Sequence, residues 1–168
     1  TLHAAEWQGG MVPPQGRALM CGFYLNELLL RLLARGDAHE ALYAHYLDTL
    51  GALAHTADFE RILRRFEKRL LSETGYGATF ETDADTGEAI VPDGRYVYQP
   101  ESGAHRAHGQ DGIAVSGRTL LDLADERFDS ARTLAESKAL MRGLINHVLG
   151  GKPLYTRQLL RDLTDLSP

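Results

Sequence analysis

The sequence predicts a mainly α-helical domain, organised as a bundle of about six helices with one irregular insertion. Apolar residues recur at helical spacing over long segments, and glycine or proline ends most of these segments. A stretch rich in glycine and acidic residues separates the earlier helical segments from the later ones. With 168 residues, 43% of them hydrophobic, the chain is large enough for one domain with its own core.

The first half of the chain is expected to hold three helices behind a short linker. Residues 1–16 are poor in helix formers and contain paired glycines and prolines, which indicates a strand remnant followed by a linker. The apolar spacing places the helices at about 17–36, 38–55 and 57–74. Asp37 is the expected N-cap of the second helix, and Gly75 ends the third. Consecutive helices with short connections favour an antiparallel bundle.

Residues from about 76 to 115 form the expected insertion, because glycines and acids replace the helical spacing there. One alternating run, Arg95-Tyr96-Val97-Tyr98, is typical of a strand. The remainder has no regular period. An irregular insertion is therefore expected, with room for one short β-hairpin between Tyr96 and Ile113.

Helices resume after the insertion. Ser116 is a candidate N-cap for a short helix, and a longer helix is expected at about 131–149. Gly150-Gly151 ends this longer helix, and Pro153 prevents its continuation. A last helix is expected at about 156–163.

Composition argues against several classes of protein. A net charge of −5 does not suit a segment whose overall field would clamp duplex DNA. Cys21 is the single cysteine, so an internal disulfide is not expected, and its apolar surroundings indicate a buried, inert thiol in a reducing compartment. No apolar run reaches the length of about 18 residues that a transmembrane helix needs, and no signal peptide is visible.

The sharpest charge pattern lies on the third predicted helix. Four basic residues recur there at i, i+3, i+4 and i+7, namely Arg61, Arg64, Arg65 and Lys68. One interpretation is a solvated face paired with Glu60 and Glu67. The other is a docking strip for an anionic partner, such as an acidic peptide or a phosphate backbone. The separation of these cations in an acidic chain favours the docking strip.

A second basic set, Lys152, Arg157 and Arg161, follows Gly150-Gly151 near the end of the chain. A phosphate-binding loop is not expected, because a helix rather than a strand precedes the glycines and Pro153 follows the lysine. A tight turn that docks the last helix is the simpler interpretation. These three cations remain candidates for contacts with DNA or another anion.

No constellation of residues predicts an enzyme or a metal site. His105 and His108 are three residues apart in the insertion, but structural zinc sites need four ligands and no thiol lies nearby. Ser102 and Ser116 lack the nucleophile motif of hydrolases. We therefore expect no metal, no cofactor and no catalytic activity.

Three segments nevertheless resemble one known family. Residues 22–33 resemble the first helix of the C-terminal domain of the RecO family, where an aromatic residue precedes an Asn-Glu-Leu sequence. Residues 63–77 resemble its block of two arginines, Phe-Glu, paired leucines and Gly-Tyr-Gly. Residues 149–160 resemble its closing Leu-Gly-Gly-Lys-Pro-Leu block. The blocks occur in the family's order over about residues 18–163.

The resemblance implies a domain organisation. Residues 1–16 would be the end of the family's N-terminal OB-fold and a linker, and 17–168 would be its C-terminal helical domain with the insertion at about 76–115. Some family members hold a four-cysteine zinc module after the Gly-Tyr-Gly block, but this chain has no cysteine there, so no zinc is expected.

The resemblance also implies a function and a site. RecO proteins are non-enzymatic, cytoplasmic and nucleoid-associated mediators that bind single- and double-stranded DNA, mainly through the OB-fold. They work with RecR, anneal strands, and help RecA to replace single-stranded-DNA-binding protein (SSB). The helical domain receives the acidic, Phe-ended tail of SSB, and the family pattern puts the tail-binding arginine at Arg64. Arg61, Arg65 and Lys68 would assist it.

Two alternatives remain open. The domain could be an all-α ligand-binding or hydrolytic domain, which would need polar groups converging in the bundle interior. It could also be a scaffold for the OB-fold, without a partner of its own. The function expected first is DNA repair through an SSB-tail site centred on Arg64.

Overall fold

The computed structural model describes residues 12–109 and 111–159. Its helices are α1 (Gly16–Leu32), α2 (Glu40–His55), α3 (Phe59–Glu73), α4 (Gly117–Ala124) and α5 (Ala131–Val148). Its strands are β1 (Arg95–Gln99), β2 (Gly103–Arg106) and β3 (Ile113–Ser116). A further helical stretch begins at Tyr155. The mainly α fold is therefore confirmed, whereas most of the expected strand remnant at residues 1–16 lies outside the described residues.

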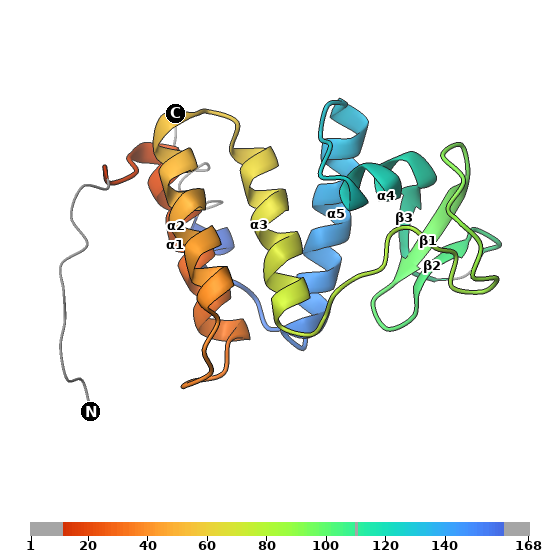
Figure 1. Cartoon of the computed structure of the whole chain (residues 1–168), viewed down its shortest axis with the longest axis horizontal. Coiled ribbons are helices and arrows are strands. Elements are labelled where there is room, and N and C mark those ends of the chain that lie inside the picture. Colours follow the sequence, from red (N-terminus) through yellow and green to blue (C-terminus); the bar gives the residue numbers. More distant parts are fainter. Residues whose placement is uncertain (1–11, 110, 160–168) are drawn as a thin grey trace.

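Helix α3 is the centre of the bundle. It packs against α2 on one side and α5 on the other, and it also contacts α1 (Figure 1). Phe66 and Leu70 on its inner face are fully buried, and the Phe66 ring stacks on His45 of α2 with the ring centroids 5.9 Å apart. The apolar spacing predicted the inner face of this helix, since Phe66 and Leu70 are among the residues that define it.

The expected N-cap of α2 is wrong. The helix begins at Glu40, its N-cap position is His39, and no side chain caps it. Asp37 lies two residues before the N-cap position, and its carboxylate contacts the His39 ring at 3.4 Å instead. An aspartate caps a helix only when it directly precedes the first helical residue.

The insertion is more ordered than the sequence predicted. It contains a three-stranded antiparallel sheet in the order β2-β1-β3, with Tyr96 paired to Arg106 on one side and to Val115 on the other. The expected hairpin therefore closes earlier, between Gln99 and Gly103, and β3 adds a second partner for β1. Buried Tyr96 and Tyr98 give this sheet its own apolar face. It lies with α4 at one end of the molecule, away from α1 and α2 (Figure 1).

Two serines fix the starts of the later helices, and one of them was predicted. Ser116 caps α4 by accepting a hydrogen bond from the backbone of Thr119, as expected. Ser130 caps α5 in the same way through Thr133. After α5, Gly150 and Gly151 adopt φ angles of 60° and 76°, which side chains with a Cβ rarely adopt. This turn sends the C-terminal segment, residues 150–159, back along the bundle.

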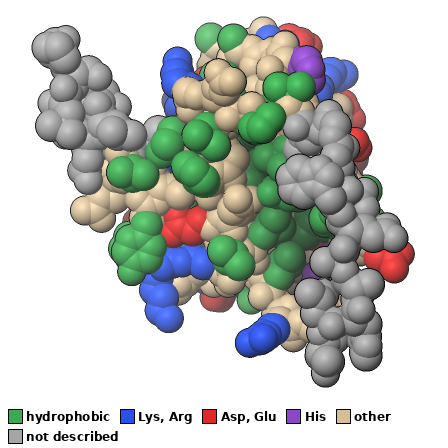
Figure 2. Space-filling view, turned by 90° about the vertical axis from the view of Figure 1, so that its left-hand side faces the viewer, with side chains coloured by type: hydrophobic (Ala, Val, Ile, Leu, Met, Phe, Trp, Pro, Cys, Tyr) green, Lys and Arg blue, Asp and Glu red, His purple; other side chains and the backbone are tan. Residues whose placement is uncertain are grey.

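The face formed by α1 and α2 carries several exposed apolar side chains (Figure 2). Leu19, Phe23 and Leu30 of α1 and Tyr43 of α2 are all at least one third exposed. None of the helices in the described residues is long and apolar enough to cross a membrane.

Candidate functional site

A cavity of about 450 Å³, here called the apolar pocket, opens between α1, α3, α5 and the C-terminal segment. Cys21, Tyr24, Phe59 and Leu63 supply its apolar wall. Five cationic side chains and one acid complete the lining: Arg17, Arg64, Lys138, Arg142, Arg157 and Glu60. An apolar cavity edged by this many cations is suited to a ligand with an apolar group and negative charges.

Arg64 is the most deeply placed cation of the apolar pocket. It is only 7% exposed, and its Nη2 donates to Glu67 Oε1 over 2.6 Å. Glu67 lies beneath the pocket and is 1% exposed. Burial raises the pKa of the Glu67 carboxyl, although nearby Arg64 and the Tyr24 hydroxyl oppose the rise.

Tyr24 connects this ion pair to the C-terminal segment. Its hydroxyl donates to Glu67 Oε1 over 2.6 Å and accepts from Arg157 Nη2 over 3.2 Å. The Arg157 guanidinium also lies over the Tyr24 ring, 5.5 Å from its centroid. Burial and the Glu67 carboxylate together raise the pKa of Tyr24, so its hydroxyl stays protonated and available as a donor.

The single cysteine also lies in the apolar pocket. Cys21 is half-buried, and burial raises the pKa of its thiol against the opposing effect of Arg17 and Arg64. The expected inert thiol therefore agrees with its surroundings, although it faces a cavity rather than a closed core. Its position makes it a natural reporter for ligands in the pocket.

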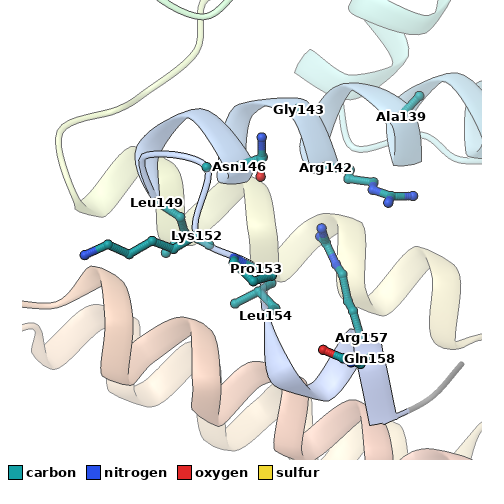
Figure 3. Close-up of a pocket in the computed structure, with 11 residues that line it drawn as sticks. Ala139, Arg142, Gly143, Asn146, Leu149, Lys152, Pro153, Leu154, Arg157 and Gln158 are labelled. Atoms are coloured by element: carbon teal, nitrogen blue, oxygen red, sulfur yellow. The ribbon is translucent and has the colours of Figure 1, made fainter. Parts of the chain in front are cut away.

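A second, larger cavity of about 860 Å³, here called the groove, lies between the second half of α5 and the C-terminal segment. Arg142 and Arg157 line both the groove and the apolar pocket, so the two cavities adjoin. Figure 3 shows both arginines pointing into the space between α5 and the C-terminal segment, while Lys152 extends away to the side. Asn146 and Gln158 add amide groups to the lining.

The basic set predicted on α3 is divided by the structure. Arg64 points to the apolar pocket, but the other three cations face the turn between α4 and α5. There Arg61 contacts Asp129, Arg65 contacts Glu126, and Lys68 contacts Glu126 and the Ala124 carbonyl oxygen. Arg61 also contacts Asp58, which directly precedes α3. These three cations already have acidic partners, unlike a free docking strip.

The structure describes two residues of the second basic set. Lys152 and Arg157 line the groove, whereas Arg161 lies outside the described residues. Sequence reasoning missed Arg17, Lys138 and Arg142 as members of the site. Lys138 and Arg142 are four residues apart on α5, a spacing that could have indicated a shared face.

A polar cluster in the insertion has the residue types of a hydrolytic triad. Ser102 Oγ is 2.7 Å from His105 Nε2, and His105 Nδ1 is 2.8 Å from Asp85 Oδ1. The Ser102 hydroxyl, however, donates to Gln99 Oε1 over 3.0 Å, which is the wrong polarity for a nucleophile activated by histidine. We interpret the cluster as a tie between the β1–β2 turn and the preceding loop. Within the described residues, no group of His, Cys, Asp and Glu side chains could hold a metal ion.

One carboxylate joins two of the segments that resemble the RecO family. Glu27 of α1 accepts hydrogen bonds from the backbone N–H groups of Tyr155 and Thr156 over 2.8 and 2.9 Å. It therefore caps the helical stretch that carries Arg157 from a distant part of the chain. Arg31, one turn later, donates to the Pro153 carbonyl oxygen over 2.7 Å.

Replacing Glu27 with glutamine is expected to lower the free energy of unfolding by about 1–2 kcal/mol, the usual cost of a lost cap. Burial raises the pKa of Glu27, but the donors of Thr156 and Tyr155 and the charge of Arg31 outweigh it, so the pKa lies below 4.5. Its stabilisation is therefore present above pH 4.5 and is lost as the pH falls further. Urea unfolding should show the gap between variant and parent narrowing in acid. A constant gap would contradict a charged cap.

Comparisons with known proteins identify the family of this chain. A family model described as "Recombination protein O C terminal" matches residues 13–158. The chain is 68% identical to the DNA repair protein RecO of Thiobacillus denitrificans, covering 100% of this chain and 69% of that protein. It is 52% identical to that of Aromatoleum aromaticum, covering 99% and 70%. For Cupriavidus metallidurans the identity is 49%, covering 97% and 56%.

These matches and the helical fold define the class as the C-terminal domain of a recombination protein. The chain belongs to the RecO family. It spans about 56–70% of the length of the three relatives named above, so the activity and partners of the whole protein are matters of proposal.

Proposed function

We propose that this chain acts in DNA repair and recombination as the partner-binding part of a mediator. Its apolar pocket would receive the acidic, Phe-ended tail of SSB, and it would act with RecR to help load RecA and anneal strands. The observation that carries the proposal is the apolar pocket, where Phe59, Leu63 and Tyr24 lie among five cations. No catalytic activity is proposed.

The tail combines an apolar ring with negative charges, and the apolar pocket offers a partner for each. A terminal aromatic ring gains free energy by leaving water for a cavity lined by Phe59 and Leu63. The chain-terminal carboxylate and acidic side chains would bind arginine guanidiniums, which offer paired N–H donors. Arg17 and Arg142 are exposed at the pocket, so they can meet such a ligand without a large rearrangement.

The structure refines which cations to test. Arg64 is the residue expected from the family pattern, but its replacement also leaves buried Glu67 without its ion-pair partner. Arg142 is exposed, lines both cavities, and has no ion-pair partner within residues 12–109 and 111–159. Arg142→Ala is therefore the variant that removes charge from the site with little effect on the fold.

Arg142→Ala is expected to weaken binding of a labelled acidic peptide ending in Phe by about tenfold, the loss of one charge-assisted contact. Fluorescence anisotropy at fixed salt measures it. Arg65→Ala is the matched control, because Arg65 neighbours Arg64 but pairs with Glu126 outside the pocket. The proposal predicts unchanged affinity for Arg65→Ala. A loss in Arg65→Ala with none in Arg142→Ala would favour the basic set on α3 over the apolar pocket.

A second measurement uses the lone cysteine. Because Cys21 lines the apolar pocket, a saturating peptide should slow its alkylation by a maleimide. The same peptide with its terminal Phe replaced by Ala should protect less. Unchanged alkylation at saturation would place the peptide elsewhere.

The groove supports a second candidate activity, the binding of a phosphate backbone by Lys152, Arg157 and Arg161. Lys152 and Arg157 line one cavity together with Arg142, which favours an anion there. Titration of labelled single-stranded DNA into this chain, with Lys152→Ala as the variant, tests it. A small-molecule ligand for the bundle interior is less favoured, because α1 and α3 bury mainly apolar groups apart from the Glu67 network.

A further inference from the structure

One buried carboxylate connects three parts of the chain beneath the apolar pocket. Glu67 Oε1 accepts from Arg64 on its own helix and from Tyr24 on α1, each over 2.6 Å. Through the Tyr24 hydroxyl the network extends to Arg157 of the C-terminal segment. Tyr24 and Arg157 are 133 residues apart in sequence. Glu67 therefore joins Arg64 directly and Arg157 through one intervening hydroxyl.

The network is poorly suited to a purely stabilising role. Arg64 Nε and Glu67 Oε2 are both buried without a hydrogen-bond partner. A buried ion pair that leaves a donor and an acceptor unsatisfied recovers little of its desolvation cost. Well-packed apolar residues of similar size would serve the core of α1 and α3 at least as well. The orphaned Arg64 Nε lies on a residue that lines the apolar pocket.

Arg64 and Arg157 are also long side chains, and a flexible side chain loses conformational entropy when it binds an anion. Immobilising such a side chain at an interface costs a factor of about 2–13 in affinity, and a preorganised side chain avoids that cost. Glu67 holds the Arg64 guanidinium directly, and Tyr24 holds Arg157 by a hydrogen bond and by its ring. Both arginines are therefore ordered before any ligand arrives.

We infer that Glu67 is a positioning residue for the two cations that receive an anionic ligand in the apolar pocket. It orients Arg64 directly, and it orients Arg157 through the Tyr24 hydroxyl. The inference rests on the proposed function of that pocket. By this inference the Glu67 carboxylate is needed for tight binding, although it has the same sign of charge as the ligand.

A positioning role and simple electrostatics predict opposite changes in ligand affinity when the charge of Glu67 is removed. Removing a negative charge near an anionic ligand strengthens binding if charge alone matters. Removing a positioning residue weakens binding, because the arginines must then be ordered at the ligand's expense. The two roles of Glu67 therefore predict opposite changes in affinity for the same substitution.

The test compares Glu67→Gln with Glu60→Gln in anisotropy titrations of the labelled acidic peptide ending in Phe. Both glutamates lie on α3, but Glu60 lines the apolar pocket, is exposed and pairs with Lys138 over 2.6 Å, whereas Glu67 is buried beneath the pocket. Glu60→Gln should bind the peptide as tightly as the parent or more tightly. Glu67→Gln should bind about tenfold more weakly, since both arginines lose their anchor. Tighter or unchanged binding by Glu67→Gln would overturn the inference.

Tyr24→Phe keeps the test independent of any loss of stability in Glu67→Gln. It removes only the hydroxyl that joins Glu67 to Arg157 and keeps the ring and both charges. We expect affinity to fall about threefold, and the effect should vanish when Arg157 is already alanine. A loss that persists in the Arg157→Ala background would also overturn the inference.

The outcomes separate the two proposals. If the parent chain does not bind the peptide, the proposed function fails. If the parent binds and Arg142→Ala weakens binding, while Glu67→Gln and Tyr24→Phe bind as the parent does, the positioning role alone fails.

Discussion

Replacing Arg64 with alanine is expected to lower the free energy of unfolding by about 3–5 kcal/mol, the usual cost of removing one partner of a buried ion pair. The variant leaves the Glu67 carboxylate, 1% exposed, with Tyr24 as its remaining donor. Guanidinium unfolding followed by circular dichroism measures the loss. This loss is larger than those expected for the Glu27 and Glu136 variants, because the remaining Glu67 charge cannot reach water without opening the core.

The pH dependence and a second substitution identify the cause of that loss. Burial already raises the pKa of Glu67 above 4.5, and removing Arg64 raises it further. The destabilisation should therefore be smallest near pH 4.5, where the buried carboxyl is protonated in the folded state, and should grow as the pH rises. Adding Glu67→Gln to Arg64→Ala should restore much of the stability. A double variant as unstable as the single one would point to lost packing instead.

Replacing Glu136 with alanine is expected to cost about 3 kcal/mol of unfolding free energy, because several charge-assisted hydrogen bonds are lost together. Glu136 of α5 accepts from the Ser116 backbone N–H and hydroxyl and from the Thr119 hydroxyl, over 2.9, 2.6 and 2.7 Å. Arg132 donates to its other oxygen over 2.7 Å. This carboxylate therefore fixes the start of α4 and the end of β3 onto α5.

Acid titration of the parent chain tests the same carboxylate. Burial raises the pKa of Glu136, but hydrogen bonds from Ser116, Thr119 and Arg132 outweigh it and lower the pKa to about 2. The stabilisation is present above the ordinary value of 4.5 and is lost as the pH falls toward 2. Glu136→Gln keeps one acceptor oxygen, so it should lose less stability than alanine and should flatten this acid dependence. An unchanged acid dependence in Glu136→Gln would contradict the assignment.

The helices were predictable because their signals are local. Apolar spacing and glycines fixed α1, α3 and α5 to within a few residues, and the caps at Ser116 and after α5 follow from residue type alone. The sheet was only half predicted. Its third strand depends on pairing with β1 across a loop, and short segments carry little information about such pairing.

The site was less predictable, because it depends on which acidic partner each basic side chain contacts in the folded chain. Helical spacing alone put Arg64 in one stripe with Arg61 and Arg65. The structure separates them, since Glu67 and the apolar pocket hold Arg64 while Glu126 and Asp129 lie beside the other two. The acids that decide the matter come from the α4–α5 turn, about 60 residues away in sequence. No periodicity within α3 could reveal them.

The connection from Glu27 to Thr156 also bears on how the domain is made in the cell. Their separation of 129 residues means that α1 leaves the ribosome long before its partner is synthesised. Arg157 lies in the same end of the chain and lines the apolar pocket, so the pocket is complete only once that segment has been made. A nascent or truncated chain would have Arg64 but not its companion. The proposed binding of an acidic peptide would thus require a chain whose synthesis has passed the C-terminal segment.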